Sequence, residues 1–297
     1  MLTRFSRLFR LVLTGTLSIT LLSACSVQQH LMRNAADALS IESRNTDDDL
    51  ELLMHASAYH LKLSESLLSQ IPDHVKLAQS VTRGYTQYAF VYLMDEADRS
   101  ESDDIQKATQ LRSRAAKMLF RAKSLGMKTL RIKHPQIDSY LQGRSTFNLT
   151  SLSPEDVGLV YWSMTSWAGA ISLSKDSPDI VADFPEVLRL AHLAWQVNPQ
   201  FEQGALASMM GTLELSKPDV KLQLAENYFD LAIQWRKDQI APLVSKAENW
   251  AVATRNRDAY VQLLEQAIDL GRQQNDLTNS VMLRRASWLL ENVENYF

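Results

Sequence analysis

Cysteine is almost absent from this chain of 297 residues, which has a single one. One thiol excludes an intramolecular disulfide framework and a metal site built from several cysteines. Glycine and proline are also sparse, at 9 and 8 residues, against an average usage of about 7% and 5%. Folds with many turns generally need more of both residues, so the composition favours a largely helical chain.

An excess of positive charge is missing too. The chain has 31 Lys and Arg against 34 Asp and Glu, a formal charge of -3, so it lacks the basic excess on which phosphate-backbone binding depends. Nucleic acid is therefore not expected as a partner. The sequence has no GxxxxGK[ST], GxGxxG, HExxH or GxSxG motif, and its six histidines are scattered. We expect no cofactor, no metal and no enzymatic activity, although the many acidic residues leave paired-carboxylate catalysis open.

The first 24 residues have the layout of a secretory signal. Three arginines precede an apolar run over residues 11–22, which is too short to cross a bilayer comfortably because a spanning helix needs about 20 apolar residues. The run ends in the sequence LSAC, whose last residue is Cys25. This tetrapeptide resembles the lipobox of bacterial lipoproteins, so we expect residues 1–24 to be removed and Cys25 to be lipidated. The alternative is an ordinary signal peptide with an incidental cysteine.

Removal of residues 1–24 would change how the chain can attach to a membrane. The removed segment has three of the 31 basic residues and no acidic residue, which leaves 28 against 34 and a charge of -6. Such a chain has little electrostatic hold on anionic lipid, so attachment would depend on the acyl chains. Ser26, in place of aspartate, resembles the sorting choice that sends lipoproteins to the outer membrane. We expect a protein anchored there and facing the periplasm, with residues 25–46 as lipidated N-terminus and spacer or first docking helix.

Helical periodicity is continuous after Thr46, and we expect residues 47–297 to form one all-α domain. Most prolines fall at the junctions between the expected helices, and Pro185 fits if its helix begins late, near Asp183. The acidic triplet over residues 47–49 predicts a helix cap rather than a metal loop, because no turn glycine or further ligand accompanies it. The expected helices cover residues 48–70, 74–98, 103–124, 135–142, 154–174, 179–197, 202–215, 219–237, 242–254, 257–273 and 276–293.

Several of these helices share an alanine between large apolar residues. Ala122, Ala194, Ala232 and Ala267 are separated by 72, 38 and 35 positions, and the first interval is about twice the others. A small residue at a period near 34 resembles the second helix of a tetratricopeptide repeat, where it lets adjacent helices approach closely. The pattern is degenerate, but it predicts a superhelical stack of antiparallel helical hairpins.

The least polar stretch of the mature chain covers residues 159–170. One interpretation is a central helix that is buried on most sides. The other is that Tyr161, Trp162 and Trp167 line a ligand cavity, because such side chains combine a large apolar surface with a polar handle.

Several segments resemble the T-component family of the tripartite ATP-independent periplasmic (TRAP) transporters, called TatT. They are Val160-Tyr161-Trp162, Trp167 to Leu173, Asp179 to Phe184, Asn198-Pro199, Gly204-Ala205-Leu206, Leu283 to Leu290 and Tyr296-Phe297. The resemblance implies a periplasm-facing lipoprotein of tetratricopeptide-like helices that assembles with the substrate-binding protein of a TRAP transporter. It also implies a homo-oligomer, since a trimer with a pore through each subunit is known in the family, and small ligands that include hydrophobic ones. Residues 100–150 carry little of the resemblance.

Two other functions are compatible with the same residues. A general tetratricopeptide-like scaffold for cell-envelope assembly would share the fold and the anchor and would need no ligand cavity. An envelope hydrolase would need a cleft with converging titratable residues, which the sequence does not indicate.

Overall fold

The protein is described here by a computed structural model, which covers residues 28–41, 49–273 and 277–297. Every regular element within these ranges is helical, and no strand occurs among them. The all-α prediction is therefore confirmed. Cys25, Asp47 and Asp48 lie outside the described residues, whereas Asp49 caps the first long helix, because its carboxylate accepts hydrogen bonds from the backbone N–H groups of Glu51 and Leu52.

The helices follow one another with short connections. A first helix covers residues 28–40. The α-helices are α2 (Leu50–Gln70), α3 (Val75–Tyr88), α4 (Asp95–Ser100), α5 (Ile105–Lys133), α6 (Ile137–Leu141), α7 (Pro154–Ser172), α8 (Pro178–Val181), α9 (Phe184–Val197), α10 (Ala205–Leu215), α11 (Leu222–Trp235), α12 (Ala241–Lys246), α13 (Arg257–Gly271) and α14 (Leu277–Glu291). Between them lie the π-helical segments η1 (Ala89–Met94) and η4 (Ala247–Ala251) and the 3-10 turns η2 (Leu149–Ser151), η3 (Phe201–Gly204) and η5 (Val293–Asn295).

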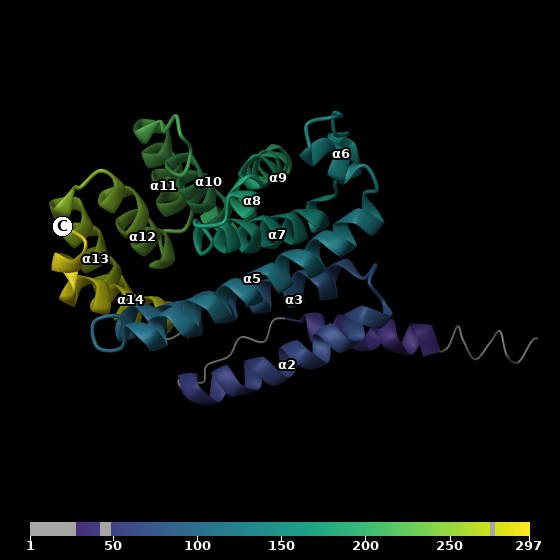
Figure 1. Ribbon diagram of the computed structural model, residues 1–297, viewed down its shortest axis with the longest axis horizontal. Helices are drawn as coiled ribbons and strands as arrows, with labels where there is room; N and C mark the ends of the chain where they lie inside the picture. The colour runs from purple at the N-terminus through teal and green to yellow at the C-terminus, as the bar shows by residue number, and fades with distance from the viewer. Residues whose placement is uncertain (1–27, 42–48, 274–276) are drawn as a thin grey trace, which may run out of the picture.

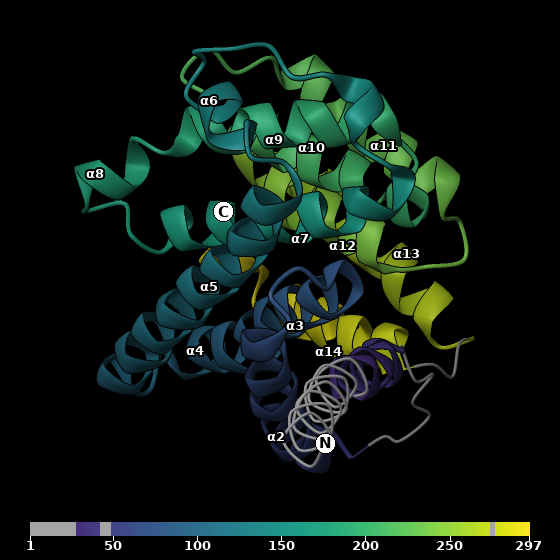
Figure 2. The same ribbon diagram turned by 90° about the vertical axis from the view of Figure 1, so that its right-hand side faces the viewer.

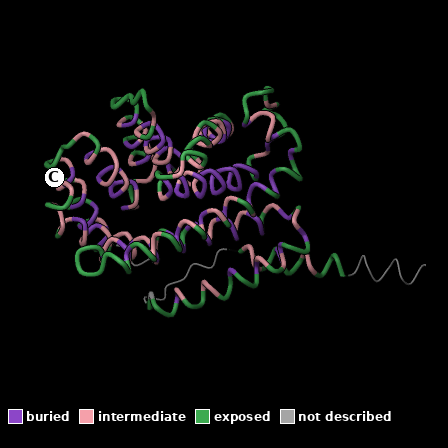
Figure 3. Tube along the Cα trace, in the orientation of Figure 1, coloured by how far each residue is buried: buried purple, intermediate pink, exposed green. Residues whose placement is uncertain are grey.

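Neighbours in the sequence pack on one another, as a stack of helical hairpins requires. The main helix pairs are α2 with α3, α3 with α5, α5 with α7, α7 with α9, α10 with α11, and α13 with α14, and α3 also packs on α7. In Figure 1 the N-terminal helices form the lower part of the molecule, the long α5 crosses its middle, and the later helices lie above and curve round to the C-terminus. Figure 3 shows that α7 is buried along most of its length, whereas α2 is largely exposed.

Some expected helix boundaries were wrong, and each difference has a local cause. The helix expected to end at residue 124 continues to Lys133, because Gly126 is not a terminus but a crossing point, where a Cβ would collide with Ser163 of α7. The helix expected over 179–197 is divided into α8 and α9, and Pro185 lies in the first turn of α9 after Asp183, where its missing N–H does least harm.

The aligned alanines lie where helices meet. Ala122, Ala194, Ala232 and Ala267 are all fully buried, which confirms them as packing positions. At Ala232 of α11 the backbone of another segment comes near, since a Cβ added to Gly204 would lie 2.9 Å from the Ala232 backbone. Whether these units are tetratricopeptide repeats stays a prediction.

The buried side chains form two hydrophobic clusters. The larger one runs from Ala36 to Leu213, and the smaller one contains residues 240–289 of α12 to α14 and the segments between them. The last helix, α14, returns to the N-terminal part of the molecule (Figure 2), where Arg284 and Arg285 form ion pairs with Asp95 of α4. In the described part of the chain no helix is long and apolar enough to cross a membrane.

Candidate functional site

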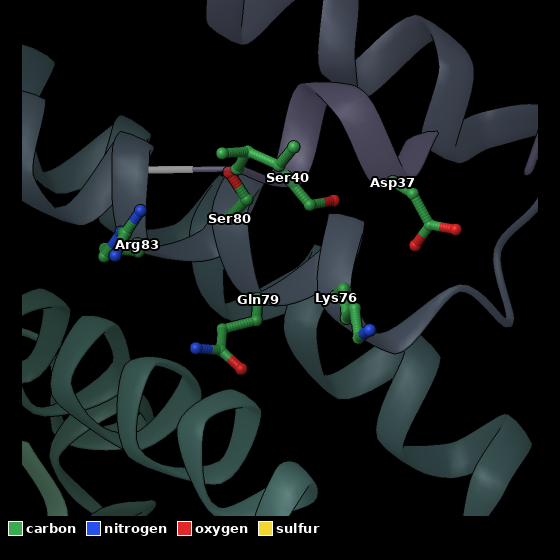
Figure 4. Close-up of a pocket in the computed structure, with 7 residues that line it drawn as sticks. Asp37, Ser40, Lys76, Gln79, Ser80 and Arg83 are labelled. Carbon is green, nitrogen blue, oxygen red and sulfur yellow. The ribbon is translucent and has the colours of Figure 1, made fainter. Parts of the chain in front are cut away.

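A groove lies between the first helix and α3 and encloses about 360 Å³. One wall is a polar stripe on α3, because residues three, four and seven positions apart share a helix face. Figure 4 shows this stripe below the first helix, which forms the other wall. The lining residues are Asp37, Ser40 and Ile41 from the N-terminal segment and Lys76, Gln79, Ser80 and Arg83 from α3.

Two polar contacts hold the first helix at the start of α3. Arg33 pairs with Asp73 at 2.5 Å, and Asp37 lies 3.4 Å from His74 Nε2. The Arg33 guanidinium lowers the pKa of the Asp73 carboxyl by its hydrogen bond. The other nitrogen of His74, Nδ1, accepts a hydrogen bond from the Leu77 N–H and so caps α3. The groove is therefore built on the capped start of α3.

The inner end of the groove approaches α7 and the η3 turn. Gln79 lies against Gly158 of α7, where an added Cβ would collide with the Gln79 amide. Arg83 attracts Glu202 of η3 electrostatically. From the opposite side, Arg236 Nη1 donates a hydrogen bond of 3.4 Å to the Glu202 carbonyl oxygen. Arg83 thus belongs both to the lining of the groove and to an interior polar cluster that it forms with Glu202 and Arg236.

Burial sets the electrostatics of this interior polar cluster. It raises the pKa of the Glu202 carboxyl, although Arg83 and Arg236 oppose the shift. It also lowers the pKa of the Arg83 guanidinium, which Glu202 opposes. The arginines therefore offset only part of the cost of placing the Glu202 charge inside the protein.

Comparison with known families decides what kind of chain carries this groove. The family model of the TRAP transporter T-component (TAtT) matches residues 46–297. The chain belongs to this family. No curated protein matches it. The match includes α3, η3 and the interior polar cluster of this T component, but it excludes the first helix, which forms the second wall of the groove.

The aromatic residues singled out from the sequence lie at two places in the T component. Tyr161 and Trp162 are together, with ring centroids 5.0 Å apart, and Phe201 lies 5.1 Å from Tyr161. Trp167 is apart from them: its Nε1 donates to Asp183 at 3.0 Å, and Lys123 lies 3.7 Å above its ring. The exposed fractions of the three are 7%, 8% and 2%. Their role as cavity lining stays a prediction.

Sequence reasoning missed the charged members of the T component's site. Arg83, Glu202 and Arg236 come from three separate elements, and none belongs to a motif. No local signal in the sequence could have found them, because a charged side chain in a helix or in the short PQFEQG connection is usually solvated.

A second polar network joins α4, η4 and α14 of the T component. Arg285 pairs with Asp98 at 2.9 Å and with Glu248 at 2.6 Å, and Arg284 pairs with Asp95 at 2.7 Å. Burial raises the pKa of the Glu248 carboxyl against the opposing charge of Arg285. This network connects the beginning and the end of the helical stack, and we assign it a structural role.

Proposed function

We propose that this T component is a non-enzymatic lipoprotein that binds the solute-binding protein of its TRAP transporter and holds a small ligand in the groove beside α3. The membership of residues 46–297 in the family is the observation that carries the proposal. The groove supports the ligand part, since it has the size of a small-molecule site and presents several convergent polar groups.

The chemistry of the groove is suited to binding rather than to catalysis. Lys76 and Arg83 supply fixed positive charge, and Gln79 supplies an amide. The Ser40 hydroxyl donates to the carbonyl of Ala36 in its own helix, at 2.5 Å, so it is not held as a nucleophile against a base. These groups orient a ligand without providing a reacting atom.

The proposal places the protein at the outer membrane, facing the periplasm. The lipobox-like end of the signal supports this, because Cys25 is the position at which a lipid would be attached. The described part of the first helix covers residues 28–40, only three positions after Cys25, so an anchor there would keep the groove end of the protein close to the lipid. Acyl chains rather than charge would supply the attachment.

Capture from the native envelope tests the proposed function. The full-length tagged chain is cross-linked in intact cells, solubilised in detergent and purified, and the attached proteins are identified by mass spectrometry. We expect a TRAP-type solute-binding protein to be enriched over a second tagged outer-membrane lipoprotein used as control. Enrichment of assembly or cell-wall proteins alone, with no solute-binding protein, would contradict the proposal.

The second candidate is a general scaffold for envelope assembly. The observation that favours it is the dense packing of Tyr161, Trp162 and Trp167, which are at most 8% exposed. A scaffold needs a filled core at this position and no ligand. It predicts the opposite result of the capture experiment, in which assembly proteins replace the solute-binding protein.

A further inference from the structure

Helix α2 exposes an apolar stripe to solvent. Leu52, Tyr59 and Leu63 are 56%, 74% and 45% exposed, and Ala56 between them is exposed as well. Positions four, seven and eleven apart share one face of a helix, so these four side chains form a continuous strip, which we call the α2 stripe. A separate set of residues packs α2 on the protein, namely Leu53, Leu61, Ser64 and Leu68. The α2 stripe is therefore not part of the protein's own core.

The side of α2 that carries the stripe has no exposed negative charge. From Leu52 to Gln70 no exposed residue is acidic, although the whole chain has 34 Asp and Glu. The one acidic residue in this range, Glu65, has a side chain that is 14% exposed and pairs with Arg121 and Lys62. Such a face is not repelled by a phospholipid surface that contains anionic lipid. Its tyrosine is also a residue type that is enriched at the interface between membrane and water.

The first helix brings α2 close to the expected lipid anchor. Leu31 of this helix is 62% exposed, and the first helix and α2 both lie in the lower part of the molecule (Figures 1 and 2). Residue 28 follows Cys25 by three positions, and three residues span at most about 11 Å. Lipid chains on Cys25 would therefore hold these exposed apolar side chains near the bilayer.

The small size of the α2 stripe favours a membrane over a free protein partner. Four side chains on one helix provide much less than the roughly 800 Å² that each partner buries in a stable protein interface. A weak contact is sufficient for a surface to which the chain is already tethered, because the tether raises the effective concentration. With a charge of -6 expected after processing, this contact has to be apolar rather than electrostatic.

We propose that α2 lies flat on the phospholipid surface and inserts the α2 stripe among the headgroups, as a second membrane contact beside the acyl chains. The inference rests on the lipid attachment in the proposed function, because the contact is too weak to hold an untethered chain. An interfacial helix buries its apolar face about 5–10 Å into the boundary between headgroups and acyl chains. The contact orients the whole protein, so that α2 faces the membrane and α11, at the top of Figure 1, faces the periplasm.

Fluorescence quenching in liposomes tests this contact on the full-length lipidated protein. The single natural cysteine carries the lipid in this form, so Tyr59→Cys supplies the only free thiol for a nitrobenzoxadiazole dye. Leu222→Cys is the matched control, because Leu222 of α11 is an apolar residue that is 47% exposed and lies far from α2. The vesicles contain phosphatidylethanolamine, phosphatidylglycerol and a nitroxide-labelled phospholipid. We expect quenching to be at least about twofold stronger for Tyr59→Cys than for Leu222→Cys.

Two added charges separate insertion of the α2 stripe from mere closeness to the bilayer. Leu52→Glu and Leu63→Glu, introduced together into Tyr59→Cys, should lower its quenching to the level of Leu222→Cys, because charged side chains do not enter the lipid. The melting temperature should stay the same, since both leucines are exposed. Equal quenching of Tyr59→Cys and Leu222→Cys, or quenching that the two charges leave unchanged, would overturn the inference.

A second copy of the chain is the other occupant that the same assay recognises. It would shift the emission of the dye on Tyr59→Cys to the blue as the protein density rises, without quenching by the labelled lipid, and this result would also overturn the inference. The mass of the purified protein separates the inference from the proposed function. An unacylated chain would refute the lipid anchor and the inference together, whereas an acylated chain with equal quenching at both positions would refute the α2 contact alone.

Discussion

Asp156 shows how one residue can join several helices. Its carboxylate accepts hydrogen bonds from the Ser153 N–H at 2.9 Å and from the Ser153 hydroxyl at 2.8 Å, which fixes the start of α7. Lys133 at the end of α5 donates to the other oxygen at 2.5 Å. The sequence Ser-Pro-Glu-Asp is typical of a helix start, with a serine at the cap, proline at the first helical position and acidic residues in the first turn. What it could not show is that Lys133 comes from another helix.

Replacement of Asp156 by Asn should lower the free energy of unfolding by about 2–3 kcal/mol at neutral pH, because a buried, multiply bonded carboxylate is lost. The hydrogen bonds of Lys133 and Ser153 outweigh burial and lower the pKa of Asp156. A lowered pKa in the folded state stabilises the protein above the unfolded value of about 4, and this contribution is lost as the pH falls through the folded pKa.

Urea unfolding of wild type and Asp156→Asn between neutral pH and pH about 3 measures this difference. It should persist down to pH about 4 and shrink below it. Asp138→Asn is the control, because Asp138 is 44% exposed in its pair with Arg131. This substitution should lower the free energy of unfolding by less than about 1 kcal/mol. A difference between wild type and Asp156→Asn that grows toward acid would contradict the assignment.

Gly204 is the residue whose backbone most clearly requires glycine. Its φ is 122°, and an added Cβ would lie 2.9 Å from the backbone of Ala232. Gly204→Ala should therefore lower the free energy of unfolding by about 2 kcal/mol or more. Gly271→Ala is the control, because Gly271 is helical and its Cβ would meet only side-chain atoms, at 3.2 Å and beyond. Thermal melts should show a large loss for Gly204→Ala and a small change for Gly271→Ala, and equal losses would contradict this interpretation.

At the scale of elements, the two π-helical segments flank the same ion network. Segment η1 ends directly before Asp95 of α4, and η4 contains Glu248. Both acidic residues contact Arg285 of α14, at 3.4 Å and 2.6 Å. A π-helical turn adds a residue to a helix and so rotates the side chains that follow it. The segments therefore orient acidic residues from distant parts of the chain toward one arginine.

Arg285 should contribute more than its neighbour Arg284 to the stability of the ion network between α14, α4 and η4. The Arg285 side chain is 17% exposed and contacts three carboxylates, whereas Arg284 is 46% exposed. Arg285→Ala should lower the free energy of unfolding by about 2–3 kcal/mol, and Arg284→Ala by less than about 1 kcal/mol. High salt should abolish the smaller effect and leave most of the larger one. Urea unfolding at two salt concentrations tests this prediction. Equal effects of the two variants would contradict the greater contribution of the buried Arg285 contacts.

The elements themselves could be read largely from the sequence. Proline positions and apolar periodicity located the helices, and the alanine spacing located their packing positions. The errors occur where tertiary contact changes the meaning of a residue. Gly126 resembles a helix end but allows α5 to cross α7. Glu202 was expected as the first residue of a helix but lies in the η3 turn, because its left-handed backbone does not fit an α-helix. The sequence has no local signal for either contact.

At the scale of the whole molecule, the interior polar cluster could not be predicted from the sequence. Tyr161 and Trp162 stood out because they lie in one unusually apolar segment. Arg83, Glu202 and Arg236 did not, because a single charged side chain in an amphipathic helix or a turn is usually solvated. Only the folding of α3, η3 and the end of α11 around α7 brings their charges together.

Attachment of the whole protein to the membrane should depend on Cys25. Cys25→Ser should block lipid transfer and leave the helical domain intact. Without acyl chains the protein should leave the membrane, because the charge of -6 expected after processing gives it no electrostatic attraction to anionic lipid. The variant is expected as soluble periplasmic protein or as uncleaved precursor at the inner membrane. Fatty-acid labelling and membrane fractionation check this, with Ser23→Ala as a variant that keeps the small residue and should retain the label. Labelled Cys25→Ser in the outer-membrane fraction would contradict the lipoprotein proposal.

Direct binding of the solute-binding protein is the measurement that bears most closely on the proposed function. The full-length T component is immobilised in detergent, and the purified solute-binding protein of the same transporter is passed over it at increasing concentration. We expect saturable binding with a dissociation constant near the micromolar range, as is common for transient partners, and no binding to an unrelated outer-membrane lipoprotein immobilised in the same way. Absence of saturable binding, or equal binding to the control lipoprotein, would contradict a role in TRAP-dependent solute uptake.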